Sequence, residues 1–227
     1  MAAADSVSVV FFWSKSVVLI PERIICFVDG FNLYHALISI GVNHYKWLDL
    51  RTLFTRLTRS KSEIVTQLYY FSAYPTWKPD SYFRHRQYVA ALVSTGVIPI
   101  MGQFKNKPKE CKQCHAKWVS HEEKETDVNL ALALLDLAYK NQYDHAFVLT
   151  RDSDIAPAIH KVKQNFPNKK ITVLAPYICR HSTELIQASD AHKTISLKHI
   201  STSLFPAEIY DAGGNLVVKR PKEYNPP

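Results

Sequence analysis

IICFVDG, residues 24–30, is the stretch that decides the fold. Its five leading apolar residues are typical of a strand buried on both faces, and such strands belong to parallel sheets covered by helices. Asp29 and Gly30 end the strand, and residues 31–40 then have the composition of a helix. A strand followed at once by a helix begins a βαβ unit. We therefore expect an α/β domain with a mainly parallel central sheet.

Strand-like and helix-like segments continue to alternate along the chain. Pro79 and Asp80 are placed to begin one helix, and Gly96 to end it. We expect further strands at 64–73, 97–104, 145–150, 171–175 and near 194–197, and helices at 50–58, 79–94, 126–140, 154–165 and 182–188. The expected domain spans residues 22–200, with an N-terminal extension of unclear role at 1–21 and a C-terminal tail at 201–227.

Composition excludes several classes of protein. With 47% hydrophobic and 21% charged residues, the chain has enough apolar surface to fold. Residues 7–20 come nearest to a membrane segment, but they contain Lys15, fall short of the ~18 apolar residues that cross a bilayer and lack a basic segment before them. Four cysteines are too few for the disulfide framework of a secreted domain. We expect a cytoplasmic protein without membrane contact.

The net charge is +8, and its distribution is informative. Residues 1–21 and 201–227 are each balanced in charge, so the whole excess lies in the expected domain. A concentrated positive field favours a polyanionic partner such as nucleic acid. The alternative is a basic protein whose charge serves only solubility.

Four aspartates are expected at one edge of the sheet. Ligands of open parallel sheets bind beyond the carboxyl ends of the strands. Asp29 directly follows the first strand, and Asp152 and Asp154 follow the strand at 145–150. Asp127 begins the helix at 126–140, on the face whose later positions are apolar and pack on the sheet. All four carboxylates are therefore expected to meet.

Clustered carboxylates raise one another's pKa and need a cation to remain ionised. Oxygen ligands favour Mg²⁺ or Mn²⁺ over zinc. An ion held in this way can supply the water that hydrolyses a phosphodiester. Each aspartate also has an ordinary alternative role, since Asp127 and Asp154 could cap helices and Asp29 and Asp152 could form turns.

Residues 105–121 interrupt the alternation and form a basic Cys-x-x-Cys knuckle inserted in the domain. The spacing of Cys111 and Cys114 allows both thiolates to bind one structural Zn²⁺, and His115 or His121 could add nitrogen ligands. Free thiols or a redox-active pair are the alternatives, because a complete site needs four ligands.

Basic and aromatic side chains are expected around the edge of the sheet where the four aspartates lie. Basic groups neutralise phosphates and aromatic rings stack on unpaired bases, so the mixture suits single-stranded or looped RNA better than a duplex. A solvated basic surface over ordinary core aromatics is the alternative. The candidate substrate-binding residues are Lys105, Lys107, Trp118, Lys124 and Arg151.

Four motifs give the chain a family resemblance: VDGFN at 28–32, EEKETDVNLAL at 122–132, LTRDSDIAPAI at 149–159, and LAP followed by HSTEL within 174–185. In this order they resemble the NYN-domain family of PIN-like nucleases, in its LabA-like branch. The resemblance implies a three-layer α/β/α, PIN-like (Rossmann-like) fold and a metal-dependent ribonuclease.

The resemblance also assigns roles to individual residues. Asp29, Asp127 and Asp152 match the metal-binding acids of the family, and Asp154 matches a further acid beside them. Asn32 matches an Asn of the first motif, and only the resemblance points to it as a candidate catalytic residue.

Three classes of function are compatible with the sequence. The leading hypothesis is an endoribonuclease that uses Mg²⁺ or Mn²⁺. The second is an RNA-binding or regulatory module with little or no turnover. The third is a phosphatase or nucleotidase, which the lack of a Gly-rich phosphate loop disfavours. A homodimer is compatible with the sequence, which does not fix the oligomeric state.

Overall fold

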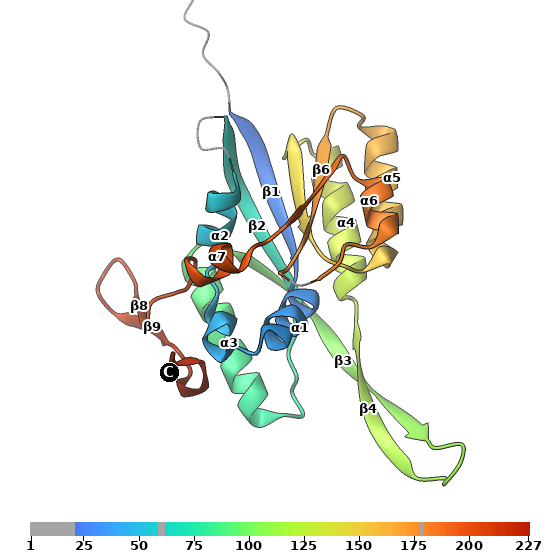
Figure 1. Cartoon of the computed structure of the whole chain (residues 1–227), viewed down its shortest axis with the longest axis vertical. Coiled ribbons are helices and arrows are strands. Elements are labelled where there is room, and N and C mark those ends of the chain that lie inside the picture. Colours follow the sequence, from blue (N-terminus) through green and yellow to red (C-terminus); the bar gives the residue numbers. More distant parts are fainter. Residues whose placement is uncertain (1–20, 59–61, 178) are drawn as a thin grey trace, which may run out of the picture.

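The computed structural model describes residues 21–58, 62–177 and 179–227. The expected N-terminal extension therefore lies outside the described residues, apart from Pro21. A seven-stranded sheet with the order β4-β3-β2-β1-β5-β6-β7 forms the centre of the domain (Figure 1). Every neighbouring pair is parallel except β3 and β4. Its strands are β1 (Glu22–Asp29), β2 (Glu63–Ala73), β3 (Ile98–Glu110), β4 (Lys117–Lys124), β5 (His145–Leu149), β6 (Lys170–Ala175) and β7 (Ala191–Thr194).

Helices cover both faces of the sheet. Side chains of β1 alternate between two apolar cores, because neighbouring residues of a strand point to opposite faces. Ile24, Cys26 and Val28 pack in one core, and Ile25 and Phe27 in the other. The first core is closed by α1 (Gly30–Ile40), α2 (Leu50–Leu57), α3 (Pro79–Ser94) and α7 (Leu197–Ser201), and the second by α4 (Thr126–Tyr139), α5 (Ala156–Asn165) and α6 (Thr183–Ala188) (Figure 1). The expected three-layer α/β/α fold is confirmed.

Capping residues set the helix ends. Asp49 accepts a hydrogen bond from the backbone N–H of Thr52 and begins α2. Gly41, with a φ of 78°, ends α1 in the left-handed conformation that glycine adopts without strain. The helix expected at 154–165 begins with a separate 3₁₀ turn, η2 (Ser153–Ile155). The last strand of the central sheet lies at 191–194, slightly before the expected position near 194–197.

The expected basic knuckle is the outer part of a long hairpin. Strand β3 pairs with β2 through residues 98–102 and then with β4 from Gln103 to Glu110, so it runs well past the expected end at residue 104. Figure 1 shows this hairpin projecting from the body of the domain. Gly102 is the last residue of β3 that pairs with β2, and a Cβ there would approach the carbonyl oxygen of Lys124 to 2.5 Å. The hairpin therefore needs a glycine at its base.

Residues 201–227, expected as a tail, pack on the domain. They contain a small hairpin of β8 (Glu208–Tyr210) and β9 (Leu216–Lys219), followed by the 3₁₀ turn η3 (Lys222–Tyr224). Val218 and Tyr224 are buried in the first core. Trp47, in the 3₁₀ turn η1 (Asn43–Trp47), donates a hydrogen bond from Nε1 to the carbonyl of Pro206 at 2.8 Å. The packed unit thus extends past the expected boundary at residue 200.

Within the described residues, no helix has both the length and the apolar character to cross a bilayer. The cytoplasmic location stays a prediction.

Candidate functional site: a carboxylate cluster at the carboxyl edge of the sheet

Asp29 is the anchor of the site. It is the last residue of β1 and the N-cap of α1, and its side chain is buried with 1% exposure. Its Oδ1 accepts from the backbone N–H of Asn32 at 3.0 Å, and its Oδ2 accepts from Thr150 Oγ1 at 2.8 Å. The side-chain amide of Asn32 also donates to Oδ2. A buried carboxylate with these donors is held in one orientation.

Thr150 connects Asp29 to the second strand end. Its hydroxyl oxygen accepts from the backbone N–H of Asp152 at 3.1 Å, and Asp152 Oδ1 accepts from the backbone N–H of Asp154 at 2.9 Å. Asp152 is partly buried and caps η2, whereas Asp154 is exposed. The ends of β1 and β5 are therefore joined by one chain of hydrogen bonds.

Asp127 completes the group from the first turn of α4. Burial raises its pKa from 3.8 to about 6, with smaller contributions from the charges of Asp29, Asp152, Glu123 and Asp154. Burial also raises the pKa of Asp29, and the charge of Asp152 adds to this, while hydrogen bonds from Asn32 and Thr150 oppose it. Asp127 is therefore within electrostatic range of Asp29, Asp152 and Asp154, and these four aspartates are called the acid cluster below.

Glu123 is a member of this environment that sequence reasoning missed. It accepts hydrogen bonds from the backbone N–H and the hydroxyl of Thr126, and so holds the start of α4 beside Asp127. Its spacing of three residues before Thr126 is the available signal. The start of α4 at Thr126 was predicted correctly, but the strand β4 that carries Glu123 was not foreseen.

The acid cluster has no cationic partner within the part of the chain that the structure describes. Among the described residues, no ion pair includes Asp29, Asp127, Asp152, Asp154 or Glu123. Lys124 pairs instead with Glu122 at 3.3 Å, and Arg151 donates to the carbonyl of Arg180 at 3.2 Å. Mg²⁺ and Mn²⁺ prefer oxygen ligands that carry negative charge. The hydrogen-bonded carboxylates of the acid cluster fit both requirements. No three of these acids, however, have ligand oxygens within 4.8 Å of one another.

A match to the NYN domain family spans residues 23–198. This chain belongs to the NYN-domain family. The family lies in the PIN-like nuclease superfamily, whose members are typically nucleases that use divalent metals. The motifs that suggested the family carry all four aspartates of the acid cluster, at 29, 127, 152 and 154.

Two individual proteins are similar to this NYN domain. A 6-hydroxy-3-succinoylpyridine 3-monooxygenase of Pseudomonas putida is 29% identical over 192 residues, which cover 69% of this chain. The chain spans only 60% of the length of that relative. A crystal structure of a protein of unknown function from Vibrio parahaemolyticus has a TM-score of 0.55 and 20% identity, and the likeness covers 78% of this chain and 94% of that one. At this identity the structural likeness shows the fold alone.

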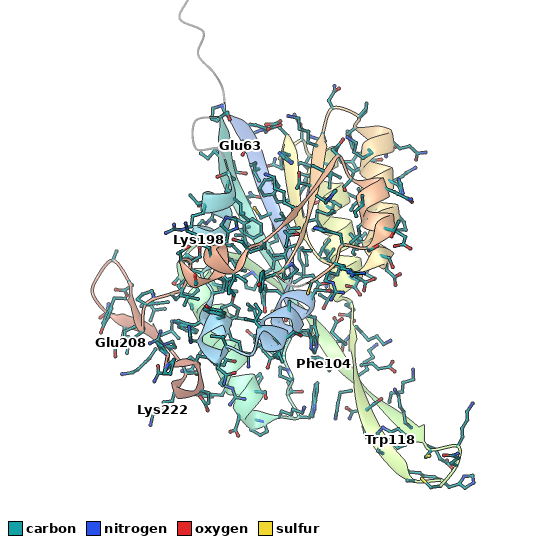
Figure 2. The ribbon with its side chains drawn as sticks, viewed as in Figure 1. Glu63, Phe104, Trp118, Lys198, Glu208 and Lys222 are labelled. Atoms are coloured by element: carbon teal, nitrogen blue, oxygen red, sulfur yellow. The ribbon has the colours of Figure 1, made fainter. Side chains whose placement is uncertain are left out.

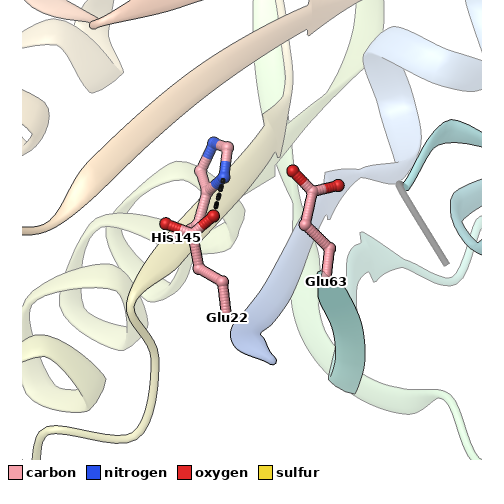
Figure 3. A group of neighbouring side chains, drawn as sticks. All are labelled: Glu22, Glu63 and His145. Atoms are coloured by element: carbon pink, nitrogen blue, oxygen red, sulfur yellow. Dashed lines mark ion pairs between the residues drawn. The ribbon is translucent and has the colours of Figure 1, made fainter. Parts of the chain in front are cut away.

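A second group of ligand atoms lies at the opposite edge of the NYN domain. Glu22, Glu63 and His145 are the first residues of β1, β2 and β5, and their ligand atoms all lie within 4.8 Å of one another (Figure 3). Glu22 is already ion-paired with Lys170, at 2.9 Å, and with His145 at 3.7 Å. This group is separate from the acid cluster, because the amino and carboxyl ends of the strands lie at opposite edges.

The expected zinc ligands are divided between the tip and the paired strands of the β3–β4 hairpin. Cys111 and Cys114 lie in the turn at its tip, where hydrogen bonds from Cys114 and Gln113 lower the pKa of Cys111. His115 in the same turn contacts Glu110 through Nδ1 at 3.0 Å. His121 lies far down the hairpin, opposite Asn106, and stacks on Trp77 with ring centroids 3.9 Å apart. The quartet is therefore not brought together, and only the two cysteines and His115 share the tip.

The expected substrate-binding residues are likewise spread along the hairpin. Lys105 and Lys107 are exposed on β3, and Lys107 is ion-paired with Glu122 at 2.8 Å. Trp118 is 49% exposed on β4, far from the body of the domain, while Phe104 lies near the base of the hairpin (Figure 2). Of the five expected substrate-binding residues, Lys124 and Arg151 lie nearest to the acid cluster in sequence. A role for all five residues in RNA binding stays a prediction.

Proposed function

We propose that this NYN domain hydrolyses RNA phosphodiesters, with Mg²⁺ or Mn²⁺ held by the acid cluster. The observation that carries the proposal is a group of carboxylates, without cationic partners among the described residues, at the carboxyl edge of a parallel sheet, where ligands of this architecture bind. Burial, with smaller contributions from the neighbouring carboxylates, raises the pKa of Asp127 to about 6 and so disfavours its charged form. A bound divalent cation would stabilise that charge.

The residues have distinct roles in this proposal. Asp29, Asp127 and Asp152 would hold the metal, and Asp154 would add a fourth carboxylate at the exposed side. Asn32 and Thr150 fix the carboxylate of Asp29 through their hydrogen bonds. When bound, the metal supplies a Lewis acid for the phosphate oxygens and lowers the pKa of a water molecule.

Substrate attraction would come from the hairpin and the net positive charge. The exposed Lys105 and Lys107 and the exposed ring of Trp118 offer phosphate neutralisation and base stacking on one projecting element. An unpaired RNA strand can use both kinds of contact, whereas a duplex hides its base faces.

One observation favours a second function, an RNA-binding module with little or no turnover. The carboxylate oxygens of the acid cluster do not converge as closely as the ligand atoms of Glu22, Glu63 and His145. A scaffold that binds RNA without cleaving it requires no such convergence.

Cleavage of single-stranded RNA by purified protein tests the proposal. The wild-type protein should cleave RNA with Mg²⁺ or Mn²⁺, and cleavage should stop when EDTA is added. The Asp29→Asn and Asp127→Asn variants should not cleave RNA but should still bind it. Asp136→Asn is the matched control, since Asp136 is exposed on the same helix as Asp127 and pairs with Lys140. Equal cleavage by wild type and both cluster variants would refute the nuclease proposal. RNA binding without cleavage under any metal condition would support the binding module.

A further inference from the structure

One cavity of the domain has a volume of about 320 Å³. It lies between α1, the end of β2, α3, the base of the β3–β4 hairpin and the C-terminal turn η3. Gly30 lines it and directly follows Asp29 of the acid cluster. No motif in the sequence indicated the cavity, because its walls come from segments far apart in the chain.

Aromatic rings form one wall of the cavity. Trp77 stacks on His121, with 8° between the ring planes, and meets the ring of Phe104 edge-on at 4.4 Å between centroids. Phe104 in turn contacts Phe31 of α1 at 5.4 Å. Tyr34 and Tyr224 line the cavity as well. Such a wall offers π-faces and edges to a planar ring.

The cavity is positively charged. Lys46, Lys78 and Arg84 line it, and none of the described residues in its lining is acidic. Burial and the nearby charge of Arg84 both lower the pKa of Lys46. Arg84 reaches one carboxylate outside the lining, that of Glu223, at 3.3 Å. A ligand with an anionic group would therefore relieve repulsion among these cations.

Polar groups complete the lining. His85 Nε2 lies 3.3 Å from the hydroxyl of Tyr70 and 3.5 Å from that of Ser72. Burial lowers the pKa of His85 to about 4, so its ring is neutral at pH 7 and has both a donor and an acceptor. Ligand sites combine apolar walls with a few placed polar groups in this way, and 320 Å³ lies at the lower end of their ~300–1,000 Å³ range.

We propose that this cavity binds the base of one unpaired nucleotide of the RNA strand, with the adjoining phosphate near Lys46, Lys78 and Arg84. The proposal rests on the proposed function, because the link from Asp29 to Gly30 is what joins the cavity to the site of cleavage. A base stacked within a duplex cannot enter a side cavity, so the cavity also gives a reason for single-stranded substrates.

The test is RNA affinity in EDTA, where no metal-dependent cleavage occurs. The probe is a labelled single-stranded oligonucleotide of about eight nucleotides, within the ~4–16 that one nucleic-acid-binding domain covers. Trp77→Ala should weaken binding by about 5- to 100-fold, as expected for one lost base–aromatic stack. Ser81→Phe should do the same by filling the cavity, while Trp77→Phe should retain most of the affinity. The matched control is Phe83→Ala, because Phe83 is 64% exposed on the same helix as Ser81 and lies outside this lining.

Removal of single bases from the RNA makes the test specific. For wild type, one abasic position should weaken binding by the same factor as Trp77→Ala. For Trp77→Ala, that abasic position should have no further effect, since the lost contact is the same. Additive losses, or unchanged affinity in both Trp77→Ala and Ser81→Phe with the fold intact by circular dichroism, would overturn the proposal.

Competition identifies the source of the bound ring. Uridine monophosphate should displace the RNA only at millimolar concentration, because it offers a single nucleotide. Displacement at micromolar concentration by pyridine-3-carboxylate would instead show a site for small aromatic acids and overturn the RNA assignment. If wild type never cleaves RNA but the Trp77 and abasic effects coincide, the nuclease proposal fails and the base-binding site stands. If cleavage depends on the acid cluster but not on Trp77 or Ser81, only the base-binding site fails.

Discussion

Replacement of Asp127 by Asn should stabilise the protein at neutral pH in the absence of metal. The pKa of Asp127 rises from 3.8 in an unfolded chain to about 6 in the folded protein. The folded state therefore binds this proton more tightly, and folding stability falls as the pH rises from about 4 to about 6. Above pH 6 the full cost of the charged carboxylate is present. Asn has nearly the same shape and no charge.

The expected gain follows from the size of the shift. A change of about two pKa units corresponds to about 3 kcal/mol at 1.36 kcal/mol per unit. Asp127 is only half-buried, and solvent screening reduces this value to about 1.5 kcal/mol. Asp127→Asn should therefore gain about 1.5 kcal/mol in free energy of unfolding at pH 7.5, and this gain should vanish near pH 4.

Urea unfolding at pH 4.5, 6 and 7.5 in EDTA measures this difference. The difference between variant and wild type is the relevant quantity, because His85, whose pKa of about 4 lies below its unfolded value, destabilises both proteins as the pH falls below 6.5. Asp136→Asn, which removes an exposed ion pair with Lys140, should instead change stability by no more than about 0.5 kcal/mol. Mg²⁺ should stabilise wild type and have little effect on Asp127→Asn. A variant that is no more stable than wild type at pH 7.5 would refute the electrostatic reasoning.

Three further changes probe other parts of the structure. Gly30→Ala should lower the free energy of unfolding in urea by about 1–3 kcal/mol and reduce RNA cleavage. The reason is that the new Cβ would lie 2.6 Å from the ring of Tyr70 and 2.8 Å from the carbonyl of Phe71. An unchanged midpoint of urea unfolding would contradict the described packing. Tyr224→Ala should cost about 3–5 kcal/mol, because this ring belongs to the first core, and a loss below about 1 kcal/mol would show that the C-terminal segment does not pack as described. The double change Cys111→Ser and Cys114→Ser should leave unfolding in EDTA within about 0.5 kcal/mol of wild type, because both residues lie at the hairpin tip. Elemental analysis of the purified proteins then shows whether any bound zinc is lost with the thiols.

The sequence predicted the sheet and the edge at which Asp29 and Asp152 lie for one physical reason. A fully buried strand such as IICFV is nearly continuous in apolar residues, so the next polar residue, Asp29, marks the carboxyl end where the loops gather. The same reasoning placed Asp152, and the apolar face of α4 placed Asp127. The register between the strands, which decides how closely the oxygens approach, has no comparable signal in the sequence.

The hairpin, the C-terminal packing and the cavity gave weaker signals. Most of the outer hairpin is exposed on both faces, so it lacks the alternation of apolar and polar residues that marks a half-buried strand. Only isolated side chains such as Val218 and Tyr224 tie residues 201–227 to the core. His121 is separated from Cys111 because antiparallel pairing places His121 opposite Asn106, which comes five residues before Cys111.

The β3–β4 hairpin constrains which changes in chain length the protein can tolerate. Strand β4 ends at Lys124, and Asp127 follows after only Glu125 and Thr126. A single residue inserted in β4 would slip the register, shift the start of α4 by about 3.3 Å and turn every paired side chain beyond the insertion to the other face. An insertion in the turn at 111–116 would be absorbed at the tip. Natural variation in the length of the β3–β4 hairpin should therefore be concentrated in the turn at its tip. The paired strands should keep a fixed length, because they set the position of Asp127.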